Sequence, residues 1–246
     1  MTDRVGQRFA AAAGRYSEHA RAQAEAAQAF DAWLALQAGA AAPRRIVELG
    51  CGTGFLTERL RRRHPGARLL ATDIAPGMVA QCRARLGGGE GLEFAVCDAR
   101  RAAFEQADWL VSSFCFQWFD DLPQVLAQLL PQARVLAFSV PMDGSFAGWR
   151  DAHHAAGLEC GLRQLPRWDD LRAACDALGA RRVVAERITI DEPHADGLSF
   201  ARALRAIGAD TPRPDHRPVP LRAVLRAMEE GGYTANYEVG FFWIER

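Results

Sequence analysis

The sequence predicts an α/β fold, built on a mostly parallel sheet with helices on both faces. Short apolar runs alternate with stretches of helical spacing along the chain, and this alternation is typical of such sheets. Three of the apolar runs end in or next to a carboxylate, at Glu48, Asp73 and Asp98. Because open α/β sheets bind ligands outside the carboxyl ends of their strands, three acids at three strand tips indicate one ligand site.

The first apolar run, residues 46–49, leads into three glycines at alternate positions, Gly50, Gly52 and Gly54. A strand, a tight turn and a helix of this composition let a ligand approach the turn backbone without meeting a Cβ. The third glycine comes one residue earlier than in the G-x-G-x-x-G of dinucleotide folds. Glu48 would also repel a pyrophosphate and attract an ammonium. We therefore expect a nucleotide cofactor with an amine and no phosphate; a chance glycine-rich turn is the alternative.

The second run, residues 68–73, ends in Asp73 and is followed by helical sequence. An acid at this place, about 20 residues beyond the glycines, commonly binds ribose hydroxyls. The alternative is that Asp73 caps the helix that starts near Pro76. The third run, residues 92–98, ends in Asp98 in the same way.

The rest of the chain supplies further strands and two helical segments that could cover the site. Strands are predicted at 109–114, 134–140, 183–190 and 237–244, with a helix at 122–130. An Ala-rich helical stretch at 8–36 is expected to cover the cofactor mouth, and an insertion at 193–234, with helical runs near 199–207 and 221–228, is a candidate substrate lid. We expect one domain, divided into a cover (1–42), a cofactor-binding core (43–192), the lid (193–234) and a final strand (235–246).

Composition excludes several classes of function. The 246 residues are 49% hydrophobic, enough for one well-buried domain. Thirty basic residues, all arginine, balance thirty acidic ones, so the neutral chain has no broad basic field for nucleic acid. Six cysteines without C-x-x-C spacing, and no secretory or membrane-spanning run, favour a reducing, cytoplasmic setting. The pair His153-His154 lacks metal-ligand spacing, so we expect no metal; we also expect a monomer.

The glycine run is similar to motif I of the class I methyltransferases that use S-adenosylmethionine. Patterns elsewhere are more selective: Arg8-Phe9 with Tyr16, His19-Ala20 and Gln23; Phe116-Gln117-Trp118; and the run Leu204-Arg205-Ala206-Ile207-Gly208-Ala209. Over almost its whole length the chain resembles the malonyl-acyl-carrier-protein O-methyltransferase family, the BioC enzymes that open biotin synthesis. It departs from that family in a compact lid and in residues 234–237, where the family often has Leu-Thr-Tyr.

The resemblance implies a seven-stranded, Rossmann-like class I methyltransferase fold with S-adenosyl-L-methionine as cofactor. It implies methylation of the free carboxylate of a malonyl thioester, carried by acyl carrier protein or by coenzyme A, as an early step of biotin (pimeloyl) synthesis. Asp98 would bond the adenine amino group. The cofactor-binding residues that it implies are Arg8, Tyr16, Glu48, Gly50, Gly52, Gly54, Asp73, Ile74, Met78, Asp98, Ala99, Ser113 and Gln117.

Such a reaction needs a cation for the acceptor carboxylate and aromatic walls that exclude water, but no base, because the acceptor is already anionic. Arginine suits a carboxylate because its fork bonds both oxygens. The candidates are Arg150, Arg163 and Arg205, with Tyr16 and Trp118 as walls; a solvated surface arginine and a core tryptophan are the ordinary alternatives.

Residues 197–227 hold six arginines against two acids, a balance that would suit an acidic carrier protein or simply a solvated face. Two other functions remain open at this point. One is a carboxyl or hydroxyl O-methyltransferase acting on a small metabolite such as trans-aconitate, and the other is a non-catalytic relative of the fold.

Overall fold

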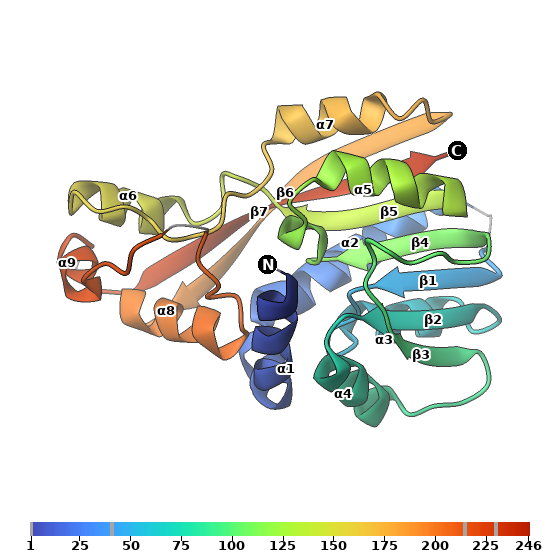
Figure 1. The fold of residues 1–246 in the computed structure, drawn as a ribbon, viewed down its shortest axis with the longest axis horizontal. Coiled ribbons are helices and arrows are strands. Elements are labelled where there is room, and N and C mark those ends of the chain that lie inside the picture. Colours follow the sequence, from blue (N-terminus) through green and yellow to red (C-terminus); the bar gives the residue numbers. More distant parts are fainter. Residues whose placement is uncertain (1, 40–41, 214–215, 229–230) are drawn as a thin grey trace.

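A computed structural model describes residues 2–39, 42–213, 216–228 and 231–246. Within these residues a seven-stranded sheet has the order β3-β2-β1-β4-β5-β7-β6 (Figure 1). Its strands are β1 (Arg45–Leu49), β2 (Arg68–Asp73), β3 (Leu92–Val96), β4 (Ala107–Ser113), β5 (Ala133–Pro141), β6 (Arg182–His194) and β7 (Tyr233–Glu245). Strands β1 to β5 pair in parallel, and β7 is antiparallel to both β5 and β6. The predicted mostly parallel α/β sheet is confirmed.

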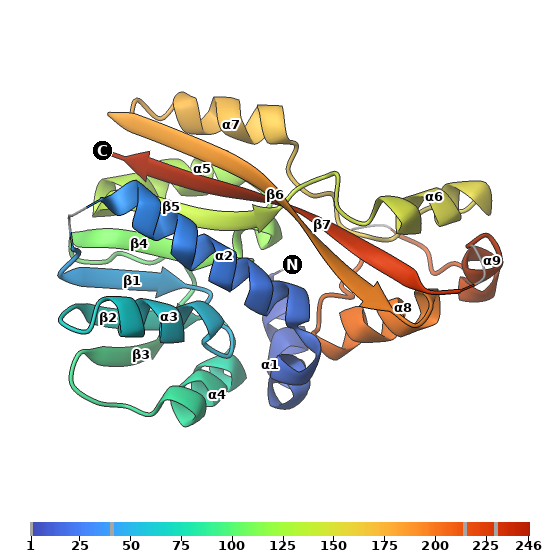
Figure 2. The ribbon, with the colours of Figure 1, turned by 180° about the vertical axis from the view of Figure 1, so that it is seen from behind.

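Helices cover both faces of this sheet. They are α1 (Thr2–His19), α2 (Arg21–Ala38), α3 (Phe55–Arg63), α4 (Pro76–Leu86), α5 (Leu122–Leu129), α6 (Ala147–Ala155), α7 (Trp168–Asp176), α8 (Gly197–Ala206) and α9 (Leu221–Arg226), with 3-10 turns η1 (Phe116–Trp118) and η2 (Leu130–Gln132). Figure 2 shows α2 and α3 on one face, whereas α5 and α7 lie on the face turned to the reader in Figure 1.

Alternate side chains of the central strands pack into two separate hydrophobic cores, one on each face of the sheet. On β4, Trp109 and Val111 pack in the core beneath α2, while Leu110 between them packs in the core beneath α5. This alternation follows from the two-residue period of a strand, and it explains why strands buried on both faces read as continuous apolar runs.

The predicted helical stretch at 8–36 is helical and is divided between two helices, α1 and α2. The chain breaks at Ala20, whose φ of −95° and ψ of 51° are not helical. After this break α2 packs along the sheet, against β4 to β7, while α1 packs against α4 and α8. Helix α1 therefore lies across the carboxyl edge of β1 (Figure 1), whereas α2 runs from this edge back along the sheet.

Strands β6 and β7 are longer than the predicted 183–190 and 237–244. Thirteen residues of each pair with the other, from Arg182 opposite Glu245 to His194 opposite Tyr233. We call this antiparallel pair of strands, β6 and β7, the hairpin, although the helical insertion joins them. Its far half extends beyond the rest of the sheet and carries α6, α8 and α9 (Figure 1). The predicted lid thus shares 193–194 and 233–234 with the strands, and residues 214–215 and 229–230 within it lie outside the described part.

An aromatic cluster holds these outer helices on the hairpin. Phe200 of α8 packs its ring 5.5 Å from Phe146, 5.3 Å from Trp149 and 5.0 Å from Tyr233. Beyond α8 the chain also approaches α1, where a Cβ on Gly208 would lie 3.0 Å from the Arg8 carbonyl oxygen. The lid and the N-terminal cover are therefore in direct contact.

Among the described helices, none is both long and apolar enough to cross a membrane.

Candidate functional site

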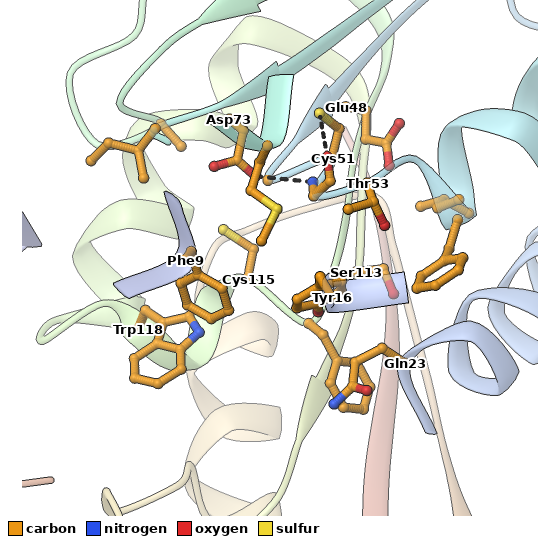
Figure 3. A pocket seen from close by; sticks show the side chains of 18 of the residues that line it. Phe9, Tyr16, Gln23, Glu48, Cys51, Thr53, Asp73, Ser113, Cys115 and Trp118 are labelled. Atoms are coloured by element: carbon orange, nitrogen blue, oxygen red, sulfur yellow. Dashed lines mark hydrogen bonds between the residues drawn. The ribbon is translucent and has the colours of Figure 1, made fainter. Parts of the chain in front are cut away.

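A cavity opens at the carboxyl ends of β1, β2 and β4, beneath α1 (Figure 3). It is lined by Val5, Phe9, Tyr16, Gln23, Ala27, Glu48, Gly50, Cys51, Gly52, Thr53, Phe55, Leu56, Asp73, Ile74, Met78, Cys97, Asp98, Ala99, Ser113, Phe114, Cys115, Trp118 and Phe119. The three predicted strand-tip acids are all in this set, so the sheet brings them together as expected.

The turn after β1 needs glycine for two different reasons. Gly50 has a φ of 72°, and a Cβ there would lie 2.5 Å from Cys115 Sγ, so the turn fits closely against the tip of β4. Gly52 has a φ of 53°, but a Cβ there would meet nothing within 4 Å. Because Gly52 lines the cavity, its missing side chain leaves the turn backbone open to a ligand.

Asp73 joins this turn to the next strand. Its carboxylate accepts hydrogen bonds from the Gly52 N–H at 2.9 Å and from the Ala75 N–H at 2.8 Å. Burial raises the pKa of Asp73, and these backbone donors oppose that effect. The residue that caps α4 is Ala75, so Asp73 is not its N-cap. Each oxygen keeps a second lone pair for a ligand hydroxyl.

Glu48 lies deep beside the turn, with 1% of its surface exposed. Burial raises its pKa well above the ordinary value, and a hydrogen bond from Thr57 opposes the shift. Its Oε2 is buried and has no hydrogen-bond partner among the described residues. A buried acceptor without a donor is costly, so this oxygen fits a ligand with a cationic or hydrogen-bond-donating group.

Asp98 remains ionised at the third strand tip. Its carboxylate takes a two-point contact from Arg100, at 2.9 and 2.5 Å, and this contact lowers its pKa. The acid still lines the cavity with Ala99, after a strand that lies two positions from β1 in the sheet.

The mouth of the cavity is aromatic. Phe9 lies 5.5 Å from Trp118 in an edge-to-face contact and 6.2 Å from Tyr16, measured between ring centroids. Desolvation raises the pKa of the Tyr16 hydroxyl, so the phenol stays protonated at neutral pH. Burial likewise raises the pKa of the Cys115 thiol to about 12.

The other predicted site residues lie outside this lining. Gly54, with a φ of 94°, packs against Cys82 behind the turn. The Gln117 amide donates to the Phe114 carbonyl oxygen at 2.8 Å, and Arg8 is half exposed and pairs with Asp210 at 2.9 Å. The cavity lining contains none of the three arginines predicted to hold an acceptor.

Those arginines differ in what they bind. Arg163 donates to the Gln117 carbonyl oxygen at 3.0 Å and pairs with Asp120 at 2.7 Å. Arg205 is 82% exposed and lies 3.5 Å from Asp210. Arg150 donates through Nε to the Ser145 carbonyl oxygen at 3.2 Å, while its buried Nη2 has no partner among the described residues.

Several lining residues were not predicted as site residues, namely Val5, Phe9, Gln23, Ala27, Cys51, Thr53, Phe55, Leu56, Cys97, Phe114, Cys115 and Phe119. Cys97, Phe114 and Cys115 stand at or just beyond strand tips, a position that could have identified them. Gln23 belongs to the N-terminal pattern that carried the family resemblance, but no chemistry was attached to it.

Comparisons with known proteins agree with this geometry. A methyltransferase domain family matches residues 46–136. The biotin biosynthesis bifunctional protein BioCD of Bordetella avium is 38% identical over 245 residues, 96% of this chain and 51% of that protein. This chain therefore spans about half the length of that relative. The malonyl-[acyl-carrier protein] O-methyltransferase of Magnetococcus marinus is 37% identical, covering 80% of this chain and 77% of the relative.

Solved structures show the same fold at much lower identity. Magnesium protoporphyrin IX methyltransferase of Synechocystis, solved with S-adenosylhomocysteine, has a TM-score of 0.58 at 16% identity, over 91% of this chain and 83% of that one. The YcgJ protein of Bacillus subtilis has a TM-score of 0.59 at 12% identity, over 89% and 99%. The chain belongs to the malonyl-[acyl-carrier protein] O-methyltransferase family and is an S-adenosylmethionine-dependent methyltransferase.

Proposed function

We propose that this chain methylates the free carboxylate of a malonyl group carried by acyl carrier protein, an early step of biotin synthesis. The substrate is the one in the name of the Magnetococcus marinus relative, and biotin synthesis is in the name of the Bordetella avium relative. The observation that carries the proposal is the composition of the cavity wall: among its described residues there is no histidine, Tyr16 and Cys115 hold their protons, and the three carboxylates, Glu48, Asp73 and Asp98, stand at the strand tips proposed for the cofactor, so no group is left to serve the acceptor as a base. An acceptor that is already ionised needs none.

The cavity fits the cofactor residue by residue. S-adenosylmethionine supplies a methyl group on a sulfonium. Glu48 and the open backbone at Gly52 suit its amino-acid end, because the buried Glu48 Oε2 lacks a donor. Asp73 suits the ribose hydroxyls. Ile74, Met78, Asp98 and Ala99, on the β2 and β3 side, line the proposed adenine end, where Asp98 is ionised and can accept from the adenine amine. Ser113, at the tip of β4, lies on the other side of the β1 turn.

The acceptor half of the reaction depends on positioning. Opposite charges on the carboxylate and the sulfonium cancel as the methyl group moves, so the protein must align the two and exclude water. Phe9, Tyr16 and Trp118 supply apolar surface at the mouth for this purpose. In suitable systems such alignment accounts for roughly 7 to 11 kcal/mol of the barrier.

Arg150 is the proposed clamp for the carboxylate. Arg163 and Arg205 already have carboxylate partners, whereas Arg150 has a buried Nη2 without one among the described residues. Arg150 follows Phe146, whose ring lies 4.7 Å from that of Tyr237, and Tyr237 lies 6.2 Å from Phe114 in the cavity wall. Arg150, whose backbone N–H bonds the Phe146 carbonyl oxygen, is thus connected to the cavity wall through Phe146, Tyr237 and Phe114.

The lid offers a surface for the carrier. Arg202, Arg217 and Arg222 form no ion pair within the described part of the chain, and an acidic partner would complement them. Neutral net charge argues against nucleic acid as the partner. We also propose that the chain acts as a monomer in the cytoplasm; its six cysteines are all free thiols, as a reducing setting requires.

The acceptor can be identified with purified enzyme and S-adenosylmethionine labelled in the methyl group. Malonyl-carrier protein, malonyl-coenzyme A, acetyl-carrier protein and trans-aconitate are tested in parallel. We expect label on the malonyl carriers and none on acetyl-carrier protein, which has no free carboxylate. Faster labelling of trans-aconitate than of either malonyl thioester would replace the proposal with a small-acid methyltransferase.

Asp73→Ala should weaken cofactor binding, since it removes two charge-assisted hydrogen bonds to the ribose, each worth roughly 1.5 to 3 kcal/mol. Isothermal titration with S-adenosylmethionine measures the loss. Asp121→Ala is the matched control, because Asp121 caps α5 and does not line the cavity, so its loss should leave affinity unchanged. An Asp73→Ala affinity within twofold of wild type would remove Asp73 from the site.

Arg150→Ala should lower kcat/KM for malonyl-carrier protein. The loss should correspond to an increase of about 2 to 4 kcal/mol in activation free energy, as expected for a buried charge-assisted pair. Cofactor affinity should survive, and Arg205→Ala, at an exposed position, should change kcat/KM by less than about 1 kcal/mol. Steady-state kinetics on both variants decide the point. Equal losses in the two variants would mean that Arg150 does not hold the carboxylate.

The methyl-transfer step should be independent of pH between about 6 and 8.5. The acceptor carboxylate, with a pKa of roughly 3 to 4, is ionised throughout this range, and the raised pKa values keep Tyr16 and Cys115 neutral. Single-turnover rates with saturating cofactor isolate this step from any titration of Glu48 during binding and from product release. A tenfold rise per pH unit would instead indicate a hydroxyl acceptor that must first lose a proton.

A further inference from the structure

A chain of buried polar groups connects the lid hairpin to the cavity. The Tyr237 hydroxyl on β7 donates to Glu192 Oε2 on β6 at 3.3 Å. His194 Nε2 lies 3.6 Å from the same carboxylate oxygen. Helix α2, which carries Gln23, packs against β7, and Gln23 acts on the Tyr237 hydroxyl as a hydrogen-bond donor. Gln23, Glu192 and Tyr237 are each less than a tenth exposed.

The direction of the hydrogen bonds among Glu192, Tyr237 and Gln23 determines the orientation of the Gln23 amide. The single proton of Tyr237 is directed to Glu192, so the hydroxyl oxygen can only accept from Gln23. Burial and the Glu192 carboxylate raise the pKa of Tyr237, while the contact with Gln23 lowers it, as a hydrogen-bond donor does. The amide nitrogen of Gln23 therefore faces Tyr237.

The amide oxygen is left without a partner. Gln23 lines the cavity below Tyr16 and Ser113 (Figure 3), and its Oε1 is buried with no hydrogen-bond partner among the described residues. Glu48 Oε2 is a second such acceptor on the wall of the same cavity. Each of these two buried acceptors needs a donor from a ligand.

We propose that Gln23 Oε1 binds the ammonium of the cofactor's amino-acid end, and that Tyr237 and Glu192 are positioning residues for it. The ammonium is the only hydrogen-bond donor at that end of S-adenosylmethionine; the other donors, the ribose hydroxyls and the adenine amine, belong beside Asp73 and Asp98. Because Glu192 and Tyr237 lie on the hairpin that carries α8, the lid strands form part of the cofactor subsite.

The test uses binding alone, with S-adenosylhomocysteine and its analogue that lacks the amino group, each titrated calorimetrically. Gln23→Ala should weaken S-adenosylhomocysteine about tenfold and leave the deaminated analogue within twofold of wild type. Tyr237→Phe keeps the ring but removes the hydroxyl, and should weaken S-adenosylhomocysteine three- to tenfold. In the Gln23→Ala background the same change should have no further effect, because Tyr237 acts only through Gln23.

Tyr233→Phe is the matched control, since Tyr233 lies on the same strand, is largely buried in the aromatic cluster and does not line the cavity. It should leave both affinities unchanged. The ratio of the two ligand affinities within one variant does not depend on the fraction of folded protein, so partial unfolding cannot imitate the result.

An equal loss for both ligands in Gln23→Ala would overturn the ammonium contact. A Tyr237→Phe effect that persists without Gln23 would overturn the positioning role. No acceptor is present in these titrations, so either failure leaves the proposed malonyl substrate untouched.

Discussion

The hydrogen bond from the Gly52 N–H to the Asp73 carboxylate is the contact on which the site depends. It joins the glycine turn after β1 to the tip of β2, and a second bond, from the Cys51 N–H to the Thr72 carbonyl oxygen at 2.8 Å, runs beside it. Parallel pairing brings both tips to one edge of the sheet, and these two bonds fix the turn there, together with the hydrogen bonds of Thr53 to Ser17 and Arg85. With the turn held, Gly50 fits against Cys115, and the open side of Gly52 faces the cavity.

Features encoded locally could be predicted from the sequence, and features set by distant contacts could not. The strand-tip acids were predictable because each follows its own apolar run. The break at Ala20 was not, since alanine is the strongest helix former and tertiary packing on the sheet sets the bend. The length of β6 was also missed, because Pro193 reads as a strand end; β6 is an edge strand, where a missing N–H is tolerated. Whether a candidate arginine is free to bind a ligand depends on its ion-pair partner, such as Asp120 for Arg163 and Asp210 for Arg205, and the sequence does not show these pairs.

The electrostatics of the cavity suit a cationic ligand. Burial raises the pKa of Glu48 and of Asp73. Keeping either acid ionised therefore costs free energy, and this cost grows as the pH rises from the ordinary pKa of the acid to its raised pKa. A bound cation offsets this cost at Glu48, and backbone donors offset it at Asp73. Asp98, beside Arg100, has a lowered pKa and carries no such cost. The cost of ionisation thus differs between the Glu48 end and the Asp98 end of the cavity, and this difference favours one orientation of an elongated ligand.

The long hairpin gives the lid two connections to this cavity. One runs through the surface, where the chain beyond α8 packs against α1 and so against the aromatic mouth. The other runs through the interior, from Glu192 and Tyr237 to Gln23. Helices held only by a surface contact could shift without any effect on a buried ligand. Because the same two strands also carry these polar residues to the cavity wall, a change in the lid would alter the proposed cofactor subsite unless the hairpin bends between Glu192 and α8.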